Sequence, residues 1–356
     1  MATDLSSASG NNRILVVSGG GSRGAWGAGF AKYLTQRYGT YKTAFGTSTG
    51  SLMIPLIITN EFDRLEEGYT SVTQKDIFEK NPFKRTGELR LFYLLLRILF
   101  GKATVGETHN LRKLIAHFLT ADVYEKIRNK DNGLLFGVTV VNFRNAQRAV
   151  KYSSEIEDVD EMRDWMWASA NQPLFMTYYP GKDQGFYVDG GVYDTIPIMP
   201  ALRYANDHPE VNEIDIIINQ PKKPIIDTNN MPSTVVKGLW RLIELWKTEV
   251  ADDDILIGLL TAHVLPTLLP EEEIKVNLHF FPTELYPENL HDLQFDKARM
   301  KKLWAVGAGG KAQAEEYGKP NRITVRKDVL KAFLAGVDPI QNEPGVKLIQ
   351  PDKALS

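Results

Sequence analysis

The first sixty residues alternate between short β-branched runs and longer runs with helical spacing of apolar residues. The run Arg13–Val17 is followed by Ser18 and three glycines, which is typical of a buried parallel strand that leads into a glycine loop. A helix is predicted over Ala25–Tyr38, where Gly27 and Gly29 would allow close packing against a sheet. The same order returns with a strand at Thr43–Phe45 and a helix at Ser51–Ile58. This alternation predicts an α/β domain.

The middle of the chain is predicted to be helical first and then β-structured. Helices are expected at Glu61–Tyr69, Glu88–Phe100 and Asn110–Phe118, within a helical insertion at about residues 61–130. Strand character returns at Leu134–Val141 and Ala149–Tyr152, and the polar residues between them predict a turn that makes the two strands antiparallel.

The second half of the chain continues the mixed pattern. We predict strands at Phe186–Val188, Ile214–Ile218 and Ile274–Phe281, and helices at Val159–Ala170, from Pro197 onwards, at Val235–Val250 and at Phe295–Tyr317. Residues 13–220 would form the core and residues 221–338 would complete the same domain. Residues 1–12 are expected to be a disordered tail, and residues 339–356 an irregular one.

Composition narrows the class of protein. With 356 residues, 43% of them hydrophobic and 24% charged, the chain is typical of a globular protein. A net charge of −2 gives no general attraction for nucleic acid. The sequence contains no cysteine, which excludes disulfides and thiolate chemistry, and its start lacks the features of a secretory signal. We therefore expect a cytoplasmic protein without nucleic-acid partners.

A five-residue motif between a predicted strand and a predicted helix places a serine at a sharp turn. The motif comprises Gly46, Thr47, Ser48, Thr49 and Gly50. A nucleophile elbow requires this order of strand, tight turn with small neighbours, and helix. Ser48 is therefore a candidate nucleophile, and the alternative is an idle serine in an ordinary glycine turn.

The glycine loop after the first strand has two interpretations. It comprises Gly19, Gly20, Gly21, Ser22, Arg23 and Gly24. A dinucleotide loop would need an acidic residue about 20 positions later, but the sequence has no Asp or Glu between Leu5 and Asn60. The backbone N–H groups of such a loop can instead stabilise an oxyanion. Arg23 would then be either a structural ion-pairing residue or a charge that favours anionic lipid.

The base that would activate Ser48 is open to two hypotheses. Histidine is the usual base, and of the six histidines only His263, His279 and His291 lie late enough for a Ser…Asp…His order. Asp189 is the other candidate, because the predicted strand before it ends there and Gly190 and Gly191 follow. A carboxylate in such a position is accessible and can approach another loop, although Asp-Gly is also a common turn pair.

The order of glycine loop, G-x-S-x-G motif and D-G-G motif resembles the patatin-like phospholipase family. The segment Ala168–Phe175 also resembles the S-A-x-x-P-x-F segment of that family, and the likeness spans about residues 13–220. Asp194 and Thr195 depart from it, since many members have asparagines there. The resemblance implies a three-layer α/β/α fold with a central, mostly parallel sheet, and a dyad of Ser48 as nucleophile and Asp189 as base. It also implies an oxyanion loop at Gly19–Gly24.

The function that follows is the hydrolysis of phospholipid or other acyl-lipid esters, without metal or cofactor. A Ser–Asp–His esterase and a non-catalytic lipid-binding effector are the alternatives. Because unregulated lipase activity would harm a cell, we also expect control by a partner, by oligomerisation or by a small ligand.

Two apolar segments suggest a contact with lipid. In Leu89–Phe100 large apolar side chains occupy nearly every face, so the segment could insert into a membrane surface, cap an acyl pocket, or be buried in the core or at a dimer contact. Ile255–Leu269 has the same ambiguity. Neither is long enough to span a bilayer.

Overall fold

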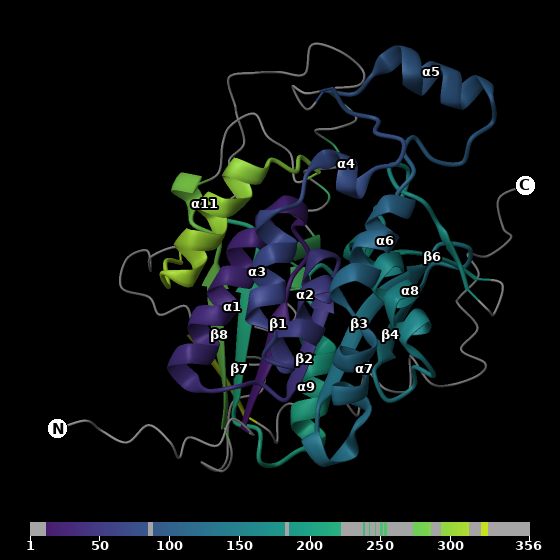
Figure 1. Ribbon diagram of the computed structural model, residues 1–356. Helices are drawn as coiled ribbons and strands as arrows, with labels where there is room; N and C mark the ends of the chain where they lie inside the picture. Colours follow the sequence, from purple (N-terminus) through teal and green to yellow (C-terminus); the bar gives the residue numbers. More distant parts are fainter. Residues whose placement is uncertain are drawn as a thin grey trace, which may run out of the picture.

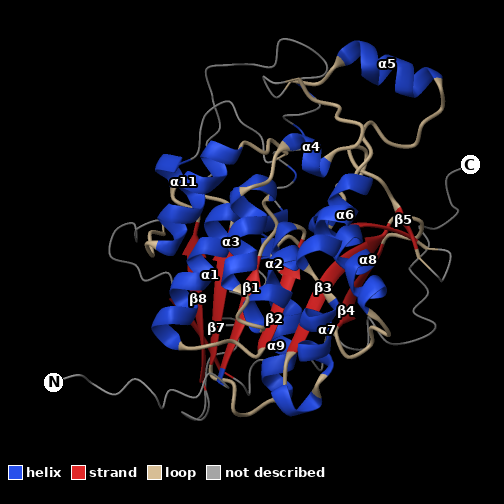
Figure 2. Cartoon of the chain, in the orientation of Figure 1, coloured by secondary structure: helices blue, strands red, loops and turns tan. Residues whose placement is uncertain are grey.

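A computed structural model describes residues 12–84, 88–181, 185–221, 273–285, 293–312 and 322–326, with isolated positions between 238 and 254. A mixed central sheet with helices on both faces forms the body of the molecule (Figures 1 and 2). The predicted helix Val235–Val250 lies largely outside the described residues. The apolar segment Ile255–Leu269 and both predicted tails lie outside them as well, apart from Asn12.

The sheet has a parallel centre and antiparallel margins. Its order is β5-β6-β3-β2-β1-β7-β8-β9, with β4 paired to β3. The parallel strands are β3 (Leu135–Asn142), β2 (Thr43–Thr47), β1 (Arg13–Val17), β7 (Glu213–Ile218) and β8 (Glu273–Phe280). The antiparallel strands are β4 (Gln147–Tyr152), β5 (Tyr179–Pro180), β6 (Phe186–Asp189) and β9 (Arg322–Arg326). The expectation of a mostly parallel sheet therefore holds for the centre, and the predicted antiparallel pair is β3 with β4.

Alternate side chains of β1 enter two separate cores, which explains the three layers. Leu15 and Val17 belong to a core shared with one set of helices, whereas Ile14 and Val16 belong to a second core on the opposite face. The first face is covered by α1 (Gly24–Tyr38), α2 (Thr49–Ile58), α3 (Phe62–Thr70), α8 (Val159–Ala170) and α11 (Lys297–Ala308). The second face is covered by α9 (Ile198–Asp207). The predicted three-layer α/β/α fold is confirmed.

The predicted helical insertion divides into packed helices and one that stands apart. It contains α3, α4 (Gln74–Ile77), α5 (Leu91–Leu99), α6 (His109–Phe118) and α7 (Ala121–Arg128). Leu65, Ile115 and Val123 anchor α3, α6 and α7 in the core. No residue of α5 is buried, and the helix lies on an arm at the top of Figures 1 and 2. The hypothesis that this segment is a core helix is therefore wrong.

The last described helix, α11, crosses α1 at very short range. A Cβ atom on Gly29 would lie 2.4 Å from the Trp304 carbonyl oxygen, and one on Gly307 would lie 2.1 Å from that of Trp26. Gly29 is therefore needed for packing against a helix, and the expectation that it packs against the sheet is wrong. Within the described residues α11 is shorter than the predicted helix Phe295–Tyr317. Asp296 caps its first turn by accepting a hydrogen bond from the Arg299 amide at 2.8 Å. Among the described helices none is long and apolar enough to cross a bilayer.

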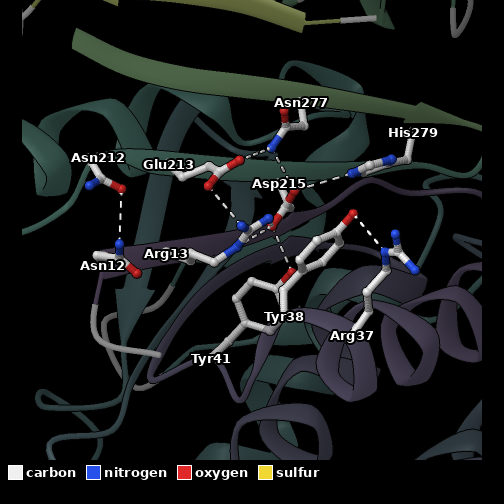
Figure 3. Close-up of polar contacts among 10 residues, drawn as sticks. All are labelled: Asn12, Arg13, Arg37, Tyr38, Tyr41, Asn212, Glu213, Asp215, Asn277 and His279. Atoms are coloured by element: carbon white, nitrogen blue, oxygen red, sulfur yellow. Dashed lines mark hydrogen bonds and ion pairs between the residues drawn. The ribbon is translucent and has the colours of Figure 1, made fainter. Parts of the chain in front are cut away.

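A buried polar network joins the strands toward the end of the sheet where β1 begins (Figure 3). Asp215 of β7 accepts hydrogen bonds from Arg13 Nη2 at 2.5 Å and from the Tyr41 hydroxyl at 2.7 Å. Asn277 Nδ2 donates to the same carboxylate at 2.9 Å, and His279 Nε2 lies 3.2 Å from it. Burial would raise the pKa of Asp215, but the His279 hydrogen bond and the Arg13 charge outweigh it and lower that pKa to about 2.

We expect Asp215→Ala to lower the free energy of unfolding by about 3–5 kcal/mol, because it removes the acceptor of the buried Tyr41 hydroxyl and leaves Arg13 with Glu213 as its one carboxylate partner among the described residues. Asp131→Ala, at an exposed aspartate, is the control. Since the pKa of Asp215 is lowered by folding, its contribution is complete above about pH 4 and is lost as the pH falls toward about 2. Urea unfolding at pH 7 and at pH 3 would check both effects. Equal costs for the two variants at pH 7 would contradict the interpretation.

Candidate active site

Ser48 lies at a strained turn between β2 and α2. Its backbone has φ 55° and ψ −125°, a conformation that non-glycine residues rarely adopt and that is typical of functional sites. The flanking glycines make the turn possible, because a Cβ on Gly46 would lie 2.7 Å from the Gly50 backbone. One on Gly50 would lie 2.2 Å from the Val17 carbonyl oxygen. The motif is thus a strand-turn-helix elbow, as the sequence predicts.

Two serine side chains hold this elbow in place. The Ser48 amide donates to Ser169 Oγ at 3.0 Å, and Ser169 Oγ in turn donates to the Thr139 carbonyl oxygen at 2.8 Å. The Ser51 hydroxyl donates to the Ser48 carbonyl oxygen at 2.6 Å. These bonds offset part of the backbone strain. Ser169 belongs to the segment Ala168–Phe175 that carried the family resemblance, but the sequence alone assigned it no role.

The glycine loop adopts a backbone that only glycine accepts easily. Gly20 has φ 156° and Gly21 has φ 55°, and a Cβ on Gly20 would lie 2.4 Å from Asn219 Cβ. The Gly19 amide donates to the Thr195 carbonyl oxygen at 3.0 Å. The amides of Gly20 and Gly21 have no acceptor within the described part of the chain. They are the donors that this loop can offer to a ligand, whereas Gly19 is already bonded.

Arg23 and Asn219 fix the loop to the end of β7. Arg23 is 6% exposed, and its Nε donates to the Asn219 carbonyl oxygen at 2.8 Å. Asn219 donates from its amide to Ser18 Oγ at 2.8 Å and from Nδ2 to the Ser18 carbonyl oxygen at 2.9 Å. Of the two hypotheses for Arg23, the structural role fits this burial. Gly24 completes the loop against Thr49, whose Oγ1 would lie 2.3 Å from a Cβ on Gly24.

Asp189 ends β6 and is 3% exposed. Its amide donates to the Asn171 carbonyl oxygen at 2.9 Å, and its Oδ1 accepts a hydrogen bond from the Gly191 amide at 2.8 Å. Gly190 packs against β3, where a Cβ would lie 2.4 Å from Thr139 Oγ1. The two glycines of the D-G-G motif therefore have different roles. Gly190 allows the chain to pack closely against β3, and the Gly191 amide orients the Asp189 carboxylate.

One open cleft brings the predicted groups together. Ser48, Asp189 and, from the glycine loop, Gly19 and Gly20 line a space of about 630 Å³ that is partly open to solvent. The remaining lining residues are Gln172, Pro173, Leu174, Phe175, Gly191, Val192, Thr195, Gln220 and Trp246. A nucleophile, a buried carboxylate and free backbone donors thus face one space, which is the composition that acyl transfer requires.

The residues that depart from the family pattern support the elbow through the backbone. The Asp194 amide donates to the Gly190 carbonyl oxygen at 2.9 Å, and its own carbonyl oxygen accepts from Thr47 Oγ1 at 2.9 Å. Asp254 Oδ2 accepts from the Ile196 amide at 2.9 Å. Burial raises the pKa of Asp194 to about 7, and burial together with the Asp194 charge raises that of Asp254 to about 8. The pair therefore retains a proton near neutral pH, at a loop that leads from Asp189.

No histidine of the described residues lines the cleft with Ser48. His279 faces Asp215 in the network of Figure 3, while His263 and His291 lie outside the described residues. Among the described side chains, one group has metal-ligand spacing, namely Glu79, Glu107 and His109. That group lies in the helical segment and does not line the cleft, and Glu107 already pairs with Arg97 at 2.6 Å.

Comparison with protein-family models identifies the family of the chain. Residues 15–202 match the family model of the patatin-like phospholipases. Among solved structures, VipD from Legionella pneumophila is 11% identical, and the match covers 89% of this chain and 68% of that chain with a TM-score of 0.39. No curated protein sequence matches the chain. Because the family model spans more than half of the residues, the chain belongs to the patatin-like phospholipase family.

Proposed function

We propose that the protein hydrolyses lipid esters through a dyad of Ser48 and Asp189. The family consists generally of lipid acyl hydrolases, which supports the class of reaction. The observation that carries the dyad is the shared cleft, in which the strained elbow presents Ser48 and the end of β6 presents Asp189. A carboxylate is a weak base for an alcohol, so this mechanism requires the Ser48 hydroxyl to approach Asp189, which is 3% exposed, closely.

The reaction proceeds by two acyl transfers. Asp189 accepts the Ser48 hydroxyl proton as Oγ attacks the ester carbonyl carbon, and the amides of Gly20 and Gly21 stabilise the resulting oxyanion. Collapse of this intermediate breaks the bond to the alcohol, which leaves with the proton from Asp189. A water molecule then loses a proton to Asp189 and attacks the acyl-serine, and the fatty acid departs as Ser48 regains its proton. These steps require neither metal nor cofactor.

The dyad predicts the loss of ester hydrolysis in Ser48→Ala and in Asp189→Asn. We expect kcat to fall by about 10³-fold or more in each, because each variant removes a group that acts in every transition state. Hydrolysis of p-nitrophenyl butyrate is the measurement, made without added factors so that turnover by the wild type would also exclude an obligatory activator. Ser154→Ala and Asp131→Asn, at exposed positions, are the matched controls.

The rival triad makes the opposite prediction for histidine. His263→Ala and His291→Ala should retain activity if Asp189 is the base, since no imidazole then takes part. Loss of activity in either variant with an intact fold would favour a Ser–Asp–His esterase. Activity in Ser48→Ala would overturn both mechanisms.

We also propose that α5 docks on a lipid bilayer, in a protein that resides in the cytoplasm. Phe92, Leu99 and Phe100 are 74%, 70% and 73% exposed, so the arm presents large apolar side chains to solvent. The root of this arm is tied to the mouth of the cleft, because the Val105 amide donates to the Leu174 carbonyl oxygen at 2.7 Å. Leu174 itself is 49% exposed and lines the cleft with Ser48. The arm that carries α5 is thus joined to the mouth of the cleft, where a lipid substrate would enter.

Membrane docking predicts that Phe92→Ser weakens binding to phosphatidylcholine vesicles. Because the burial of a phenylalanine side chain contributes about 1.5–3 kcal/mol, we expect the partition coefficient to fall by about tenfold or more. Cosedimentation in a Ser48→Ala background measures binding without hydrolysis. Phe143→Ser, at a phenylalanine exposed in the turn between β3 and β4, is the control. Equal partitioning of the two variants would contradict the role of α5.

A further inference from the structure

Two more cavities continue from the cleft into the helical layer. The first is lined by Ser48, Gly21, Ala170, Gln172, Met176 and Leu293, among others, and its space of about 380 Å³ is partly open to solvent. The second lies between α2, α3 and α6 and reaches Leu56, Gly68 and Phe118, and its space of about 560 Å³ is also partly open to solvent. The two cavities share the lining residues Thr49, Leu52, Ile77, Leu111 and Phe295. The two cavities are therefore adjacent, the first of them begins at Ser48, and we call the pair the α2–α3–α6 groove.

The wall of this groove is apolar and uncharged. None of its lining residues is Asp, Glu, Lys, Arg or His. Two of the polar residues in its wall bond to each other, because the Tyr69 hydroxyl donates to the Thr49 carbonyl oxygen at 2.7 Å and lies 2.9 Å from Thr49 Oγ1. Burial raises the pKa of the Tyr69 hydroxyl, so this group stays neutral. The groove therefore suits a hydrocarbon chain and excludes a charged group.

Glycine at position 68 keeps the far part of the groove open. Gly68 lies within α3, where glycine is about 1 kcal/mol less favourable than alanine. A Cβ on Gly68 would lie 3.5 Å from the Phe118 ring, which is an ordinary contact, so the packing does not require glycine. Protein interiors are normally filled, and an apolar space that stays empty forfeits dispersion contacts until an apolar ligand enters it.

We propose that the α2–α3–α6 groove binds the acyl chain of the substrate and that Gly68 sets the chain length it accepts. This inference rests on the proposed function and adds the substrate class, which is esters of long, unbranched fatty acids. The ester carbonyl lies at Ser48, with the acyl chain in the groove. The alcohol and head group lie in the other cleft, which Asp189, Thr195 and Gln220 line.

The test is the chain-length profile of Gly68→Leu. Its side chain would fill the far part of the groove, so we expect kcat/KM for p-nitrophenyl palmitate to fall by about tenfold or more. The value for p-nitrophenyl butyrate should stay within about twofold, because a short chain does not reach Gly68. Glu67→Leu, at the adjacent exposed position of α3, should preserve both values. Equal effects of Gly68→Leu on the two esters, or no effect on either, would overturn the proposal.

A second variant tests the groove if Gly68→Leu fails to fold. A binding experiment tests the groove independently of the proposed catalytic dyad. Leu114→Trp fills the same cavity from α6, and Lys113→Trp is its exposed control on that helix. Palmitate binding to Ser48→Ala, measured by calorimetry, should weaken about tenfold when Gly68→Leu or Leu114→Trp is added. If the wild type cleaves no ester but these variants still weaken palmitate binding, the proposed dyad fails and the groove stands. Unchanged palmitate binding in both variants would overturn the groove.

Discussion

The parallel pairing of β1 with β2 and β7 is the constraint on which the site depends. Parallel strands end at the same edge of a sheet, so the loops that follow these three strands must meet there. Those loops carry the glycine loop, Ser48 and Asn219. Their backbones approach so closely that a methyl group on Gly20 or Gly50 would overlap a neighbouring strand end. The glycines of both motifs are therefore required by the meeting of strand ends before any chemistry is considered.

The strained serine persists because rigid neighbours hold it from several directions. Ser169 comes from α8 and binds the Ser48 amide, while Thr47 bonds to the Asp194 backbone that follows the D-G-G motif. Asp189 reaches the same edge along β6, which is antiparallel to β3, so its position depends on the margin of the sheet instead of its centre. At the opposite end of β1, the buried network around Asp215 fixes how the strands align. Elbow and acid are thus positioned by two different parts of one sheet.

The sequence predicted the elements whose signal is local, and it missed those that depend on distant partners. The strands around Ser48 are short apolar runs next to glycines, so their position and the three motifs could be read directly. Asn219 and Asp215 could not, because their roles come from partners about 200 residues away. For Leu89–Phe100 a core helix was one of the open alternatives, because the apolar pattern of a segment does not show which neighbours cover it. Gly29 was assigned the wrong partner for the same reason, because α11 lies far along the chain.

Ser48 stands at the junction of two environments with different chemistry. The cleft contains the Asp189 carboxylate among apolar residues such as Leu174, whereas the α2–α3–α6 groove contains no charged residue. An ester has the same division, with a polar alcohol on one side of its carbonyl and a hydrocarbon chain on the other. A substrate placed in the reverse direction would bring its head group against the apolar wall, where a charged or polar group without partners is strongly disfavoured. In the proposed reaction, desolvation of the charged group would therefore set the orientation of the ester at Ser48 and place its alcohol on the side of Asp189.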